Sequence, residues 1–167
     1  MARADRPPPL RLFLDSGVVL EGLLVSKSAS RAVLVLARSK AFKLVLAEYV
    51  RREVEDHLLH LIDRDAVAAD EIIDAYVKLL HAVTPETVPL PTREEIDRHR
   101  HLIHHQTDVP VLVSAIRAAP DHLVTTNTRH FTARVATRTS LSIITPRGLL
   151  AKMGTRGRPT SSSARPH

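Results

Sequence analysis

Short apolar runs alternate with longer amphipathic segments along this chain, and this alternation limits the folds it can adopt. The runs have the length and composition of buried strands, and the segments between them have the apolar spacing of helices. We predict strands at residues 10–15, 42–47, 87–90, 122–126 and 141–145, and helices at residues 28–39, 48–62, 67–81, 93–105, 109–119 and 147–153. The run at 87–90 lies between prolines, which favours an edge strand. Strands that alternate with helices predict an α/β domain around a mainly parallel sheet.

The composition is that of one globular domain with a tail at each end. The chain has 167 residues, 44% hydrophobic and 25% charged, which is enough for a single domain with a core. We place this domain at residues 10–153, after a flexible tail at 1–9 and before a disordered basic tail at 154–167. The two tails carry +4 of the net charge of +6, so charge alone does not indicate a nucleic-acid partner.

Several classes of protein are disfavoured by what the sequence lacks. There is no cysteine, which excludes disulfides and thiolate metal ligands. No apolar run is long enough to span a membrane, and the opening "MARADRPPPL" does not have the apolar segment of a secretory signal. We therefore expect a cytoplasmic protein. An aromatic content of 3% argues against a nucleic-acid surface built on stacked aromatic rings.

Asp15 ends the first predicted strand, "LRLFLD". Ligand sites in open α/β sheets form outside the carboxyl ends of the strands, so this carboxylate is a candidate site residue. Burying a lone carboxylate is costly unless it is paired, hydrogen-bonded or bound to a metal. A purely structural role, as the cap of the next helix, would also explain it.

Acidic residues elsewhere in the chain could reach the same edge of the sheet. In the helix at 48–62, Glu53 and Glu55 border the apolar stripe on opposite sides, whereas Glu48 and Asp56 point away from it. The periodicity does not decide between Glu53 and Glu55.

Asp108 opens the apolar helix at 109–119. Thr107 is a suitable N-cap, and Pro110 is tolerated in the first turn, which places Asp108 where the helix dipole favours a negative charge. This structural role is sufficient to explain the residue, and it is also compatible with metal binding.

A polar cluster, "TTNTRH", follows the strand at 122–126. Asn127 could ligate a metal, hydrogen-bond a metal-bound water or make a turn. Arg129 beside it is our preferred phosphate contact. His101 and His105, four residues apart on the helix at 93–105, could share a metal, although a solvated helix face, including His104, is the favoured interpretation.

Taken together, four segments resemble a PIN domain, the nuclease fold that includes the VapC-type toxins of toxin–antitoxin pairs. They are "LFLDSGVVLEGLL", "LVLAEYVRREVEDHL", "TDVPVLVSAIRAAPDHLVTTNTRHF" and "IITPRGLL", in the order typical of the family and spanning residues 10–151. The resemblance implies a three-layer α/β/α sandwich. It also implies an endoribonuclease that uses Mg²⁺ or Mn²⁺, with RNA as substrate and an antitoxin or a second copy of the chain as partner.

The resemblance also implies roles for individual residues. Asp15, Glu53 and Asp108 match the metal-binding acids of the family, which selects Glu53 over Glu55. Asp15 is the first of these acids, and Ser16 and Thr125 match the supporting hydroxyl residues of the family. With only oxygen ligands on offer, Mg²⁺ or Mn²⁺ is favoured over zinc.

Two positions depart from the pattern of the family. Gly17 replaces a small polar residue, and Asn127 stands where many members have a fourth acid, so we expect weaker affinity for a second ion. The alternative is a PIN-like domain that no longer cuts and acts as an RNA- or protein-binding module. Phosphatases that need a second acid two residues after the strand aspartate are disfavoured, because that residue is Gly17.

Overall fold

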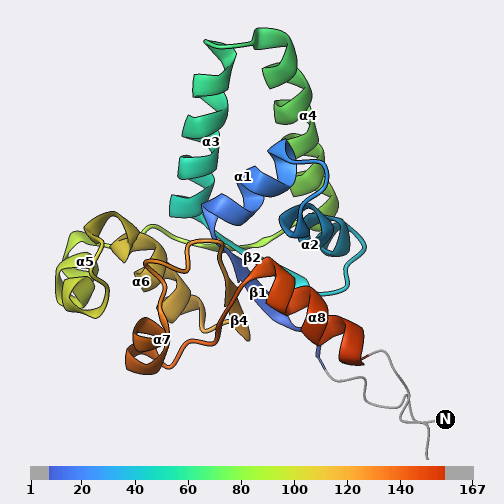
Figure 1. The fold of residues 1–167 in the computed structure, drawn as a ribbon. Coiled ribbons are helices and arrows are strands. Elements are labelled where there is room, and N and C mark those ends of the chain that lie inside the picture. The colour runs from blue at the N-terminus through green and yellow to red at the C-terminus, as the bar shows by residue number, and fades with distance from the viewer. Residues whose placement is uncertain (1–7, 157–167) are drawn as a thin grey trace, which may run out of the picture.

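Five parallel strands with helices on both faces form the body of the protein in a computed structural model, which describes residues 8–156 (Figure 1). The strands are β1 (Arg11–Leu14), β2 (Lys43–Ala47), β3 (Glu86–Val88), β4 (His122–Val124) and β5 (Ile143–Ile144). The helices are α1 (Ser16–Leu24), α2 (Ala29–Arg38), α3 (Glu48–Ile62), α4 (Ala66–Val83), α5 (Arg93–His99), α6 (Val109–Ala118), α7 (Ala133–Thr139) and α8 (Pro146–Arg156). Two short 3₁₀ turns, η1 (Arg100–Leu102) and η2 (Gln106–Asp108), lie between α5 and α6.

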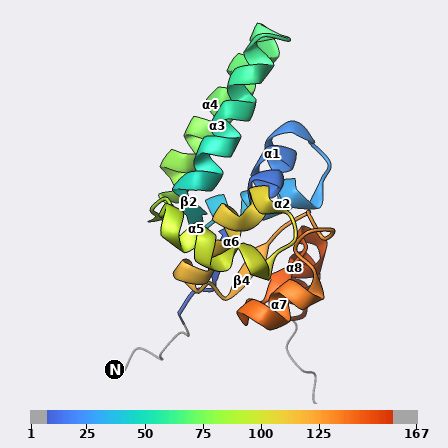
Figure 2. The ribbon, with the colours of Figure 1, turned by 90° about the vertical axis from the view of Figure 1, so that its left-hand side faces the viewer.

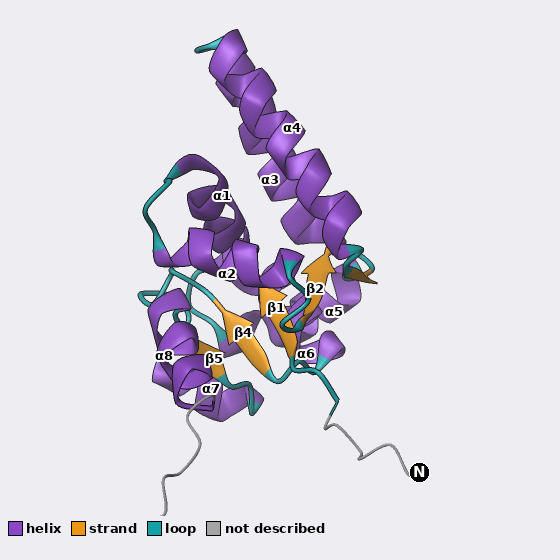
Figure 3. Cartoon of the chain, turned by 90° about the vertical axis from the view of Figure 1, so that its right-hand side faces the viewer, coloured by secondary structure: helices purple, strands orange, loops and turns teal. Residues whose placement is uncertain are grey.

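The strand order β3-β2-β1-β4-β5 places a change of winding direction between β1 and β4. The chain first builds outward from β1 to β2 and β3, and then returns to the other side of β1 to add β4 and β5. Connections between parallel strands are right-handed. The helices between β1 and β3 and those between β3 and β5 therefore cover opposite faces of the sheet. Figures 1 and 3 show α1 to α4 on one side of the strands and α6 on the other. The predicted α/β/α sandwich is confirmed.

The central strands are buried along almost their whole length. Leu12, Phe13 and Leu14 of β1 have no exposed surface, and residues 44–47 of β2 are at most 2% exposed. Near-continuous apolar strands are typical of a parallel sheet that is covered on both faces. β3, the strand between prolines, lies at the edge of the sheet as predicted.

Two helices were not predicted from the sequence. The segment that forms α1, "SGVVLEGLL", is apolar on most sides and shows no stripe that separates it from a strand. Asp15 starts this helix, since its side chain accepts a hydrogen bond from the backbone N–H of Ser16. The short α7 is begun in the same way by Thr132, which accepts from Val135 N–H.

The predicted helix at 93–105 is too long. It ends at His99, and after η1 the chain becomes extended at Ile103, whose side chain is 3% exposed and belongs to the core. Burying this apolar side chain turns the backbone away from the helix axis. The predicted N-cap is also wrong: α6 follows Asp108 rather than Thr107, and the Thr107 hydroxyl lies 2.8 Å from Nδ1 of His105.

The helices α3 and α4 form a hairpin that projects from the sheet (Figure 2). Leu59, Val67 and Val77 on this hairpin are 59%, 76% and 45% exposed. Across residues 8–156, none of the helices combines the length and the apolar character needed to span a bilayer.

The predicted tails lie mainly beyond the described part of the chain. Helix α8 continues to Arg156, so the first residues of the predicted tail at 154–167 are helical. The remainder of that tail, and most of the tail predicted at 1–9, lie outside residues 8–156.

Gly22 tests the close packing of α1 on α2. A Cβ atom at this position would lie 2.5 Å from Leu34 Cδ1 and 3.0 Å from the Ser30 carbonyl oxygen. We expect Gly22→Ala to lower the free energy of unfolding by about 1–3 kcal/mol, because backbone must move to admit the methyl group. Urea denaturation measures this change. Gly154→Ala is the matched control, because nothing lies within 4 Å of its added Cβ; equal stability of the two variants would contradict the packing argument.

Candidate metal centre

The candidate site lies where β1 and β4 end side by side. Parallel pairing continues past the strands, since Asp15 N–H donates to the Val124 carbonyl at 3.0 Å and Thr125 N–H donates to the Ile144 carbonyl at 3.0 Å. These bonds fix Asp15 and Thr125 at the carboxyl edge of the sheet. The edge is also the point at which the winding direction changes, the usual position of a ligand site in open α/β sheets.

Asp15 is 6% exposed and uses both carboxylate oxygens. Oδ1 accepts from Ser16 N–H at 2.8 Å, and Oδ2 accepts from the Thr125 hydroxyl at 2.7 Å. Burial raises the pKa of Asp15, these hydrogen bonds oppose the rise, and the charge of Asp108 adds to it. Asp15 is therefore a helix cap and also one member of a group of carboxylates.

Glu53 is the acid of α3 that reaches this group. Burial raises its pKa, the neighbouring Ser16 hydroxyl acts in the opposite direction, and the charges of Asp15 and Asp108 raise it further. Its Oε2 atom is buried without a hydrogen-bond partner among residues 8–156. A buried carboxylate oxygen with no donor is costly, and this cost disappears if a cation is bound there.

The other acids of α3 take part in surface ion pairs. Glu55 lies 3.2 Å from Arg51, and Glu48 lies 3.1 Å from Arg52. Asp56 is exposed. Glu53, not Glu55, is thus the residue that the structure brings near Asp15 and Asp108.

Asp108 precedes α6 and makes no capping bond to the helix. Its Oδ2 atom instead lies 2.6 Å from Nδ1 of His130 and 3.8 Å from Nδ1 of His105. Tyr49 belongs to the same surroundings. Burial and the charges of Glu53 and Asp108 raise its pKa. No sequence pattern places Tyr49 here, and His105 was considered only together with His101, whereas His130 stood in the polar cluster after β4 and could have been found.

Asn127 lies beside His130. Its Nδ2 atom is 2.9 Å from Nδ1 of His130, and its backbone N–H donates to the Thr125 hydroxyl at 3.0 Å. Its carbonyl oxygen accepts from Phe131 N–H at 3.0 Å, which makes a turn. Asn127 thus makes the turn considered from the sequence, and its side chain lies against the ring that contacts Asp108.

The histidines that surround Asp108 form a second group of potential ligands. One ligand atom each from His105, Asp108 and His130 lies within 4.8 Å of the others. The two rings are stacked, with centroids 4.0 Å apart and planes 11° apart. Parallel rings direct their nitrogen lone pairs side by side rather than at one point, so both could bind one ion only after a ring rotation. Within residues 8–156, His101 is not a member of this group.

The residues at the edge of the sheet fit a hard divalent cation. Asp15, Glu53 and Asp108 lie close enough for their charges to oppose one another, Glu53 has one unpartnered buried oxygen, and carboxylate oxygens are the ligands that Mg²⁺ or Mn²⁺ prefers. Among residues 8–156 the ligand atoms of these three acids do not all lie within 4.8 Å of one another, so the acids would draw together around an ion. Arg129, two residues after Asn127, is exposed.

Residues 11–129 match the sequence model of a family described as PIN domain. The chain belongs to the PIN domain family. The match includes all three acids, and it confirms the resemblance found in the sequence. PIN domains are generally nucleases. No curated protein sequence matches this PIN domain protein.

Solved structures show the same fold at low sequence identity. PAE2754 from Pyrobaculum aerophilum is 14% identical with a TM-score of 0.57, over 87% of this chain and 90% of that chain. VapBC2 from Rickettsia felis, solved bound to a DNA fragment from its promoter, is 14% identical with a TM-score of 0.58, over 81% of this chain and 98% of that chain. These similarities support the fold.

The raised pKa of Glu53 predicts how stability depends on pH. A carboxyl group with a higher pKa in the folded state stabilises the fold below its ordinary pKa of about 4.3, and this contribution is lost as pH rises through the folded value. With EDTA present, Glu53→Gln should therefore match the native protein near pH 4 and melt at a higher temperature near pH 7.5. Thermal unfolding followed by circular dichroism measures both.

Glu55→Gln serves as the control, because it removes only a surface ion pair, worth less than about 1 kcal/mol. A Glu53→Gln variant that is no more stable than this control at neutral pH would contradict the argument.

Thr125 tests the support of Asp15. Thr125→Val removes the hydroxyl that donates to Asp15, so the pKa of Asp15 should rise further. We expect Mn²⁺ affinity to fall about 10- to 100-fold, as for other residues that orient a ligand. The loss should grow as the pH is lowered, an effect that a purely structural defect would not produce. Isothermal titration with Mn²⁺ measures it, with Thr137→Val on the exposed surface of α7 as control; unchanged affinity would refute the role.

Proposed function

We propose that this protein is a metal-dependent ribonuclease that hydrolyses RNA phosphodiester bonds. The observation that carries the proposal is the group formed by Asp15, Glu53 and Asp108, three acids from distant segments of the chain. The charge of Asp108 raises the pKa of both other acids, and Glu53 also responds to Asp15. Such a group is unfavourable in isolation and becomes favourable with a divalent cation.

In this proposal the three acids hold Mg²⁺ or Mn²⁺. When bound, such an ion lowers the pKa of a coordinated water and neutralises charge that develops on a phosphodiester. Ser16 and Thr125 orient Asp15 through hydrogen bonds to its two oxygens. His130 orients Asp108 in the same manner, through Nδ1, which lies 2.6 Å from Oδ2 of Asp108. Asn127 as a further ligand, and Arg129 as the phosphate contact, stay predictions.

RNA as the substrate, and the role of toxin in a toxin–antitoxin pair, rest on the family and on the similarity in fold to VapBC2. A protein partner has a suitable surface in the α3–α4 hairpin, where Leu59, Val67 and Val77 are exposed. Apolar side chains gathered on a projecting element are typical of interaction sites. We propose an antitoxin or a second copy of the chain as the occupant, in a cytoplasmic protein.

A binding module without nuclease activity is the second candidate. It is favoured by Asn127, which leaves no carboxylate in the cluster after β4. The two functions differ in their need for metal, because a module that only binds RNA or protein has no use for Mn²⁺ uptake that depends on Asp15.

Cleavage of RNA tests the proposed function. We expect the native protein to cleave a mixed RNA pool under single-turnover conditions with Mn²⁺. Asp15→Asn and Asp108→Asn should each slow cleavage by at least about 100-fold, more than the loss of an outer-shell partner. Glu55→Gln should cleave at the native rate. Cleavage that persists in both aspartate variants would eliminate this mechanism, and absence of cleavage together with absence of Mn²⁺ binding would favour the binding module.

A further inference from the structure

A groove with a volume of about 740 Å³ opens beside the candidate metal centre. One wall is the segment between α5 and α6, with Arg100, His101 and His104. The other wall is α7 and the residues before it, with Arg129, Arg134 and Arg138. In Figure 1 these elements lie together on the side of the molecule away from α8.

The residues that line the groove carry positive charge only. They include four arginines and four histidines, and no aspartate or glutamate. Arg129, Arg134 and Arg138 are exposed and make no ion pair within residues 8–156, whereas Arg100 lies 2.7 Å from Asp97. A concave surface lined by charge of one sign concentrates its potential and attracts polyanions.

The spacing of the two arginines on α7 suits a ligand with regularly repeated phosphates. Arg134 and Arg138 are four residues apart, so they lie on the same side of the helix about 6 Å from each other along its axis. Guanidinium groups bind phosphate through paired hydrogen bonds, and unpaired arginines in a row suit successive phosphates of an extended strand.

The groove reaches the neighbourhood of Asp108. His105 and His130 line it, and both face Oδ2 of Asp108. A strand with one phosphate at the metal centre can therefore continue directly into the groove. His101 and His104 are exposed along this path, and imidazole rings can stack on unpaired bases. An acidic peptide would use the charges but not the rings.

We propose that this groove binds the backbone of single-stranded RNA on one side of the bond to be cut, through Arg129, Arg134 and Arg138. The inference rests on the proposed function for the direction of the strand, but binding itself requires no catalysis. The groove therefore defines a binding site separate from the acids.

Anisotropy of a short fluorescein-labelled single-stranded RNA, measured in EDTA at several salt concentrations, tests the proposal. We expect the double variant Arg134→Gln with Arg138→Gln to bind about 10- to 30-fold more weakly at moderate salt. The slope of log binding constant against log salt concentration should become shallower by about 1.4, because each contact to a phosphate of a single strand contributes about 0.7 to this slope.

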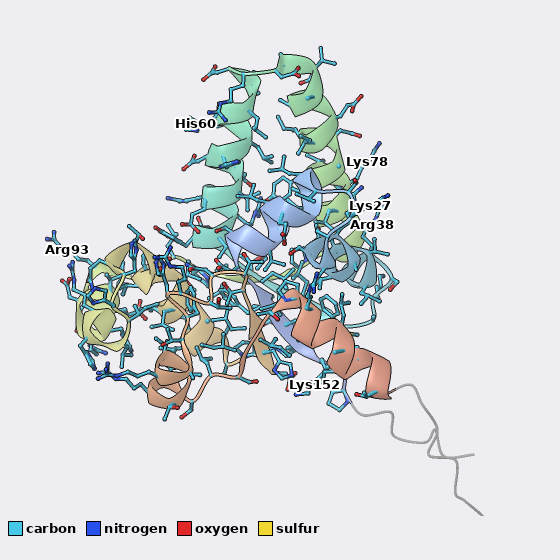
Figure 4. All side chains as sticks on the ribbon, in the orientation of Figure 1. Lys27, Arg38, His60, Lys78, Arg93 and Lys152 are labelled. Carbon is cyan, nitrogen blue, oxygen red and sulfur yellow. The ribbon has the colours of Figure 1, made fainter. Side chains whose placement is uncertain are left out.

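The matched control is Arg38→Gln with Arg64→Gln. Both residues are exposed, and neither lines the groove. Arg38, labelled in Figure 4, lies across the molecule from α5 and α7. This control should bind RNA as the native protein does, and melting temperatures of both variants exclude a folding defect.

Three results would overturn the proposal: no RNA binding by the native protein, equal binding by the groove variant and the control, or displacement of RNA by polyglutamate as readily as by an RNA of equal charge. The last result would identify an acidic protein as the ligand. Failure of the proposed function is distinct, because a protein that binds RNA through this groove but never cleaves it with Mn²⁺ would support the groove alone.

Discussion

Repulsion between carboxylates at one edge of the sheet is the constraint on which the rest of the site depends. Asp15, Glu53 and Asp108 come from the end of β1, the middle of α3 and the start of α6, and each is held by its own element. The chain cannot relieve the repulsion by moving one acid away, since Asp15 is fixed by backbone pairing to β4 and by two side-chain hydrogen bonds. In this arrangement one carboxylate oxygen of Glu53 is buried without a hydrogen-bond partner among the described residues.

The neutral and basic groups around Asp108 complement this acidic centre. His130 contacts Asp108 rather than adding to its repulsion, and the amide of Asn127 contacts His130. The same histidine lines the basic groove. The hydrogen bond between His130 and Asp108 therefore joins the acidic centre to the basic groove.

The strands and most helices follow from local patterns, because buried parallel strands are continuous apolar runs and amphipathic helices show their period. Asp15 could be predicted from its place at the end of β1. Periodicity could not decide between Glu53 and Glu55, since both border the same apolar stripe, and only the resemblance to the family selected Glu53. The fold decides it: Glu55 lies with Arg51 and Tyr76 of α4, on the side of α3 away from the acids. His105 was considered as a ligand only together with His101, and its place beside His130 could not be predicted because the two rings meet through the unpredicted break after α5.

The capping bond from Asp15 to α1 has a practical consequence for mutagenesis. Alanine at position 15 would remove both the charge and the cap, and loss of a cap alone destabilises a helix by about 0.5–2 kcal/mol. An inactive alanine variant could then reflect a frayed α1 rather than missing chemistry. Asparagine keeps an oxygen that can accept from Ser16 N–H, so α1 stays capped and a loss of function in that background reports on the chemistry of the carboxylate.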